Sequence, residues 1–244
     1  MRLKGAFIAV IAFVFIVSPF AQETADNQSS GDVSTIEEYY LSQDIELRLI
    51  QDEAYSESEE LKQLALRNLE KMADEGRLSD DGAAFTILQT LATETYSKEV
   101  KRNNRVVNNF PEIRRQACQL LGKIGGEKAK DILLDVVQKE KEPMVVAEAV
   151  YGLGKIGIND NEEVTNVLAF KLHQENLKTT PDNNLAFSTL LAIEKLAKTN
   201  NGISNPELVS AIGEIITRGN YIRPVKLKAL SVLEEMRKAA ATNK

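Results

Sequence analysis

Apolar side chains recur along this chain at the spacing typical of α-helices, and the helical segments themselves repeat. The five-residue stretch 121–125 (LGKIG) occurs again, unchanged, at 153–157, an interval of 32 residues (121 to 153). Weaker copies follow the same framework, in which a small residue is followed by apolar residues four and seven positions on. Repeats with a period of about 20–50 residues are typical of stacked helical arrays.

The pattern predicts five first helices, each of which begins a repeat. They span residues 57–73, 111–124, 143–156, 182–198 and 223–238. Between them, apolar stripes at helical spacing indicate four second helices. These stripes contain Leu88, Val136, Leu168 and Ile212. No second helix follows the last first helix, so we expect it to cap the stack and to carry charge on its outer side.

Glycine occupies two kinds of position in the repeated stretch. Gly125 and Gly157 come just past the apolar positions, where a left-handed conformation can end a helix. Gly122 and Gly154 fall inside the helices, where glycine costs about 1 kcal/mol relative to alanine. We expect a close crossing of neighbouring helices to be the reason for this second pair.

Residues 111–125 (PEIRRQACQLLGKIG) resemble the first helix of the HEAT-like repeats of the phycobilin lyase type. The second copy departs from this motif, because Val146 and Ala147 replace the pair Arg114 and Arg115. The resemblance implies an all-α fold, a right-handed α-solenoid of about four to five HEAT-like helix pairs. It also implies that the two arginines tie one repeat to the turn of its neighbour. This repeat class includes binding scaffolds, lyases and nucleic-acid enzymes, so the fold does not select a function.

Residues 1–21 have the layout of a secretory signal peptide. Arg2 and Lys4 precede an uncharged run over 5–17, and the small residue Ala21 ends the segment. The apolar run is shorter than the roughly 20 residues of a membrane-spanning helix. We therefore predict cleavage after Ala21 and a periplasmic location, with an uncleaved inner-membrane anchor as the alternative.

The rest of the chain divides into four parts. Residues 22–33 are polar and acidic, which predicts a flexible tether. Residues 34–53 predict an N-terminal helix with one apolar face; it either caps the first repeat, as we expect, or awaits a partner. Residues 54–240 form the predicted HEAT-repeat solenoid, and residues 241–244 a short tail.

Composition argues against several classes of function. The net charge of −6 becomes −8 once the signal peptide is removed, and nucleic-acid binding requires concentrated positive charge. His173 is the only histidine and Cys118 the only cysteine, so we predict no zinc site, no catalytic residue and no cofactor. We expect Cys118 in the core, together with aromatic residues at helical spacing such as Phe170 and Tyr221.

The longest interval between repeats lies before residue 111. The small residue Ala65 is followed by its equivalent Ala117 after 52 residues (65 to 117), whereas the other intervals are 32 or 40. We expect the extra residues, 97–110, to form a loop or short helix at the binding edge. The candidate partner-binding residues in this insertion are Lys98, Lys101, Arg102, Arg105, Asn108 and Asn109. The alternative is a solvated segment whose charges pair within the molecule.

The sequence therefore predicts a periplasmic scaffold for protein–protein interaction, an accessory or assembly subunit of a cell-envelope complex without enzymatic activity. Its expected partner is another envelope protein with an acidic contact surface, steered by the basic segment 98–115. The second helices are expected to line the concave side. Two alternatives remain: a carrier that binds a peptide or small molecule in its groove, and a lyase-type enzyme, which rests on the resemblance.

Overall fold

A computed structural model describes residues 36–97, 99–218 and 220–242 of the 244-residue chain. The predicted signal peptide and tether, and the candidate residue Lys98, lie outside these ranges. Among the helices in these ranges, we find no segment with the length and hydrophobicity needed to span a membrane.

Ten α-helices make up most of the described chain, and they stack as pairs in a HEAT-like α-solenoid. They are α1 (Ile36–Tyr55), α2 (Glu59–Asp74), α3 (Ala83–Ser97), α4 (Pro111–Ile124), α5 (Glu127–Lys139), α6 (Pro143–Ile156), α7 (Glu163–Asn176), α8 (Asn183–Thr199), α9 (Pro206–Thr217) and α10 (Arg223–Thr242). A short hairpin, β1 (Lys101–Arg102) and β2 (Arg105–Val106), precedes α4, and a 3-10 turn, η1 (Asp160–Glu162), precedes α7. The predicted all-α fold class is confirmed.

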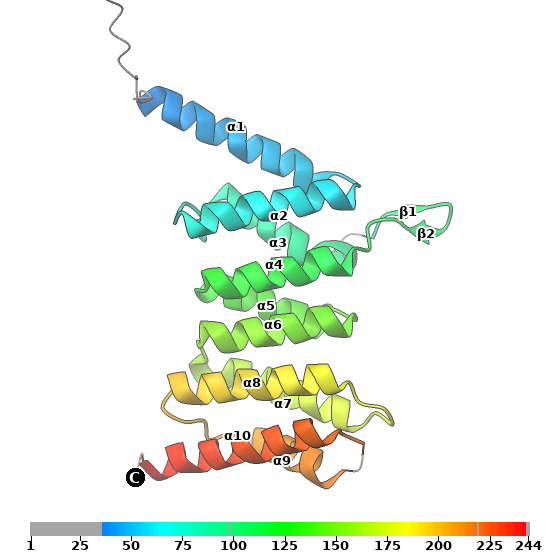
Figure 1. Ribbon diagram of the computed structural model, residues 1–244, viewed down its shortest axis with the longest axis vertical. Helices are drawn as coiled ribbons and strands as arrows, with labels where there is room; N and C mark the ends of the chain where they lie inside the picture. Colours follow the sequence, from blue (N-terminus) through cyan, green and yellow to red (C-terminus); the bar gives the residue numbers. More distant parts are fainter. Residues whose placement is uncertain (1–35, 98, 219, 243–244) are drawn as a thin grey trace, which may run out of the picture.

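The helices form two layers along the stack (Figure 1). The first helices α2, α4, α6, α8 and α10 make one layer, and the second helices α3, α5, α7 and α9 lie behind it. Helices α4 and α6 have the predicted bounds, 111–124 and 143–156. Helix α10 continues to Thr242, so residues 241 and 242, which we assigned to the tail, are helical.

The first helices of the central repeats contact each other backbone to backbone. A Cβ atom added at Gly122 on α4 would lie 2.7 Å from the Cα atom of Gly152 on α6, and one added at Gly154 would overlap Ala192 on α8. Close crossing is therefore the reason for these glycines, as we predicted. Gly157 ends α6 in the left-handed conformation with φ of 78°, also as predicted.

Arg115 ties α4 to the following repeat, the role that the resemblance implied, whereas Arg114 joins α4 to the end of α5 in its own repeat. The Nε atom of Arg114 donates to Oε2 of Glu140 at 2.6 Å, and both side chains are buried at the end of α5. Burial opposes the charge of Glu140, but Arg114 and nearby backbone N–H groups hold its pKa below the usual value. Arg115 reaches Glu148 on α6 at 3.1 Å.

The apolar core runs along the whole stack between the two layers, and it contains most of the residues we expected there. Cys118 is fully buried, and burial raises the pKa of its thiol. Tyr221 is buried and donates its hydroxyl to Oδ1 of Asn176 at 2.7 Å. The prediction for Phe170 is wrong, because its side chain is 62% exposed. It lies about half a turn from Leu168 in the buried stripe of α7 and therefore faces solvent.

Candidate partner-binding site

The insertion before α4 is a β-hairpin that projects beside the stack (Figure 1), and not the loop or short helix that we expected. Its strands are antiparallel, with Arg102 opposite Arg105. Asn103 and Asn104 connect them with φ values of 48° and 62°. Two-residue hairpin turns of this kind need positive φ at both positions, which asparagine tolerates well. The Asn-Asn pair is the one local signal that could have predicted the hairpin.

The hairpin gathers three of the predicted basic residues on an exposed tip. The Nζ atom of Lys101 lies 2.8 Å from the Oε2 atom of Glu99, and the Nη2 atom of Arg102 lies 2.7 Å from the Oε2 atom of Glu57. Glu57 belongs to the turn between α1 and α2, so the second pair ties the hairpin to the first repeat. Arg105 is also exposed. Two of the three bases thus pair within the molecule, as our alternative interpretation held, although both remain accessible.

The two predicted asparagines lie at the base of the hairpin. The side chain of Asn108 is 4% exposed, and its Oδ1 atom accepts a hydrogen bond from the backbone N–H of Val100 at 2.9 Å. Asn109 accepts a hydrogen bond from Nη1 of Arg114 at 3.0 Å. These contacts hold the hairpin in shape and join it to α4. Asn108 is therefore a structural residue, and its burial removes it from the accessible surface to which we assigned it.

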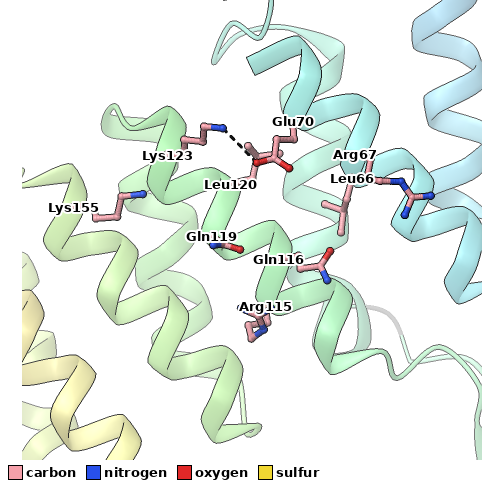
Figure 2. Close-up of a pocket in the computed structure, with 9 residues that line it drawn as sticks. All are labelled: Leu66, Arg67, Glu70, Arg115, Gln116, Gln119, Leu120, Lys123 and Lys155. Carbon is pink, nitrogen blue, oxygen red and sulfur yellow. Dashed lines mark hydrogen bonds and ion pairs between the residues drawn. The ribbon is translucent and has the colours of Figure 1, made fainter. Parts of the chain in front are cut away.

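A groove of about 440 Å³ crosses the first-helix layer from α2 over α4 to α6 (Figure 2). Its apolar floor includes Leu66 and Leu120, which are buried. Gln116 and Gln119 place amide groups along the middle of it. Sequence reasoning missed this groove, because its walls are polar positions from three successive repeats that only the stacking brings together.

Basic residues outnumber acidic ones among those that line the groove. The Nζ atom of Lys123 lies 3.3 Å from Oε1 of Glu70 (Figure 2) and 2.5 Å from Oδ1 of Asp74. Hydrogen bonds to these two carboxylates raise the pKa of Lys123. Arg67 and Lys155, from α2 and α6, are exposed. Glu70 is the acidic residue among those that line the groove. An acidic partner surface would complement this wall.

The second-helix layer carries a more apolar groove of about 400 Å³ between α5 and α7. Val137, Val167 and the exposed ring of Phe170 line it. His173, one turn further along α7, is exposed, and its Nδ1 atom lies 3.9 Å from Oε1 of Glu214. Within the described ranges, histidine, cysteine and acidic residues form no group able to hold a metal ion. Both layers thus offer grooves, and the expectation that second helices line a concave side stays a prediction.

Comparison with known proteins identifies the repeat type. Residues 105–176 match the family described as HEAT repeats. Among solved structures, the chain is similar to the complex of CpcE and CpcF of phycocyanin lyase from Nostoc sp. PCC7120, with a TM-score of 0.53 and 16% sequence identity. The similarity covers 79% of this chain and 65% of that chain, so less than two thirds of the relative is matched. No curated protein sequence matches this chain. Residues 105–176 therefore match HEAT repeats, and the described helices as a whole have the fold of an α-solenoid.

Proposed function

We propose that this chain is an exported scaffold that binds another cell-envelope protein through its first-helix layer and has no enzymatic activity of its own. The groove across α2, α4 and α6 is the observation that carries this proposal. A surface that collects hydrogen-bonding and charged groups from three successive repeats suits an extended protein segment, and repeat proteins commonly present surfaces of this kind.

The rigid spacing of the central helices supports binding by this groove. The backbone contact between Gly122 and Gly152 fixes the distance from α4 to α6, so the amides of Gln116 and Gln119 keep their places relative to Lys155. A site held in its binding geometry before the partner arrives loses less conformational entropy on binding. The repeat architecture therefore supplies the preorganisation that a scaffold needs.

The charge on this side of the molecule indicates the chemistry of the partner. Arg67 and Lys155 lie at opposite walls of the groove, and the hairpin with Arg105 directly precedes α4, which forms its middle. Positive charge along a surface accelerates the approach of an acidic partner and disfavours basic ones. We infer that the partner presents carboxylates to this face.

In-cell crosslinking with mass spectrometry tests the proposal. We compare the native chain with the double variant Arg67→Glu/Lys155→Glu, and we use Lys139→Glu/Lys198→Glu, the same charge change at exposed positions outside the groove, as a matched control. We expect the groove variant to lose the dominant envelope partner several-fold while the control retains it. Equal capture by both variants would refute binding at the groove.

The periplasmic location is a separate part of the proposal and rests on residues 1–21. Arg2 and Lys4, the uncharged run and Ala21 together follow the signal-peptide layout. Cell fractionation followed by N-terminal sequencing tests it, and we expect a periplasmic chain that begins at Gln22. A chain that retains Met1 in the membrane fraction would support the anchor, and a cytoplasmic chain would refute export.

The groove between α5 and α7 favours a second candidate function, the carrier of a peptide or small molecule. Phe170 exposes an aromatic face next to Val137 and Val167, an arrangement that suits an apolar ligand. Native mass spectrometry of protein purified from its own host tests this candidate. A bound mass that disappears in Phe170→Ala would favour the carrier. The likeness to phycocyanin lyase is one of fold alone, so we do not extend lyase activity to this chain.

A further inference from the structure

The two end helices of the stack expose apolar side chains where a capping helix is expected to be polar. Leu41, Ile45 and Leu49 of α1 form a row one turn apart, and Leu227 and Leu230 do the same on α10; their exposed fractions lie between 44% and 66%. Terminal repeats of a solenoid normally present a polar outer face, because nothing stacks on it. Contiguous exposed apolar residues typically mark an interaction surface.

Both rows point away from the body of the molecule. Helix α1 packs against α2 and α3 through the face that contains Ile50 and Ala54, and the row centred on Ile45 lies on the opposite face. Helix α10 packs against α8 and α9 through Val225 and Ala229, again opposite its exposed leucines. The two helices lie at opposite ends of the stack (Figure 1), so the apolar rows face outward in opposite directions.

We propose that the α1 end of one copy docks on the α10 end of a second copy, so that the chain assembles head to tail. The charges beside the two rows are complementary. On α1, the row is flanked by Asp44, Arg48 and Asp52, all exposed. On α10, the leucines are flanked by the bases Arg223 and Arg237 and by the acid Glu234, all exposed. The first face therefore has a surplus of acid and the second a surplus of base.

The geometry of the helices agrees with this pairing. Both have 20 residues and are therefore about 30 Å long. The chain runs along α1 in the direction opposite to α10 (Figure 1), so two copies stacked in the same orientation bring these helices together antiparallel. In that arrangement Leu227 can lie opposite Leu49, and Leu230 opposite Ile45. The same register brings Arg223 to within one residue of the position opposite Asp52.

A contact between two different ends of the same chain is heterologous, so it leaves one free end of each kind and can propagate. The interface would also continue the helix-on-helix stacking that builds the molecule itself. Head-to-tail assembly thus accounts for both apolar ends with one contact, and it leaves the first-helix groove and the hairpin on the sides of the assembly.

Sedimentation velocity on the chain that begins at Gln22, and on two blocked variants of it, tests the proposal. Ile45→Lys blocks the α1 end and Leu227→Glu blocks the α10 end, and both positions are exposed, so the fold is retained. We expect the mass of the native chain to rise with concentration, and each blocked variant alone to stay at the mass of one chain. A mixture of the two variants retains one intact end of each kind, so we expect it to form a discrete complex of two chains.

Each other outcome overturns the proposal. A native chain that keeps the mass of one chain at all concentrations excludes self-assembly through these ends. Association of Leu227→Glu alone would show a symmetric pairing of α1 helices, and association of Ile45→Lys alone would show a pairing that does not need α1. Met144→Lys on α6 is the matched control, because Met144 is 50% exposed and α6 packs between α4 and α8 in the middle of the stack, and we expect this variant to assemble like the native chain.

Discussion

The central repeats and the two ends of this solenoid are built from the same kind of helix, but they differ in how closely the helices pack and in how far their ion pairs are buried. In the centre, α4, α6 and α8 touch backbone to backbone, and the buried pair of Arg114 and Glu140 joins α4 to the end of α5. At the α1 end, Arg77 and Glu46 form the corresponding tie, but both side chains are partly exposed, and Ile45 faces solvent. The central contacts fix the distances between neighbouring helices, whereas the end helices keep apolar side chains available for contact with another molecule.

Removing the central tie should have the largest effect on stability. We expect Arg114→Ala to lower the free energy of unfolding by about 3 kcal/mol, because it leaves the Glu140 carboxylate buried without its partner. Arg77→Ala, at the partly exposed end, should cost less than about 1 kcal/mol. Urea unfolding followed by circular dichroism measures both.

The double variant Arg114→Ala/Glu140→Ala is the control for this prediction. It removes the unpaired carboxylate, so we expect it to be more stable than Arg114→Ala alone. Equal losses of unfolding free energy for Arg114→Ala and Arg77→Ala would contradict this prediction. They would show that the deeper burial of the central ion pair does not make its removal more costly.

Adding a methyl group where two helices cross should cause the next largest loss of stability. We expect Gly154→Ala to cost about 2 kcal/mol, because the new Cβ atom overlaps Ala192 on the neighbouring helix. Gly213→Ala on α9 is the matched control, since a Cβ atom there meets no neighbour within 4 Å. The control should gain up to about 1 kcal/mol from the higher helix propensity of alanine. The difference between their urea midpoints measures the effect, and a stabilised Gly154→Ala would contradict close crossing.

The same contrast explains how much of the molecule the sequence could predict. Where the repeat is most regular, as at Gly122 and Gly154, the motif predicts the helix bounds and the close crossing, because neighbouring repeats impose the same local constraint. Phe170 was misplaced because α7 has apolar residues on more than one face, so periodicity alone does not identify the buried one. The groove around Gln116 could not be predicted, because it depends on the distance between repeats and not on any local pattern.

We expect a smaller loss of stability at acidic pH, where the carboxylate of Glu112 becomes protonated. The hydrogen bond from Arg115, with a second from Gln116, lowers the pKa of Glu112 to about 2. A carboxylate whose pKa is lower in the folded state stabilises the fold above its unfolded pKa, near 4.5, and loses that contribution as the pH falls towards 2. Because Glu112 is 43% exposed, the contribution should be no more than about 1 kcal/mol.

Glu112→Gln tests this contribution with pH as its own control. At pH 7 we expect the variant to be less stable than the native chain, and we expect the difference between the two urea midpoints to shrink as the pH falls towards 2, where about half of the native carboxyl groups are protonated. A stability difference that stays constant over this pH range would show that the Glu112 charge does not contribute through its pairing with Arg115.

The smallest effect on stability, and the sharpest separation of folding from binding, is expected at the hairpin. Reversal of charge in Arg102→Glu/Arg105→Glu breaks the exposed pair with Glu57, which should cost less than about 0.5 kcal/mol, and helicity should not change. If the hairpin steers an acidic partner, crosslinked capture falls several-fold in this variant although the fold is intact.

Arg105→Glu alone keeps the contact between Arg102 and Glu57, so a loss of capture in the single variant would assign steering to the exposed tip. Full capture in both variants would instead mean that the hairpin pairs its charges within the molecule and that binding depends on the central groove.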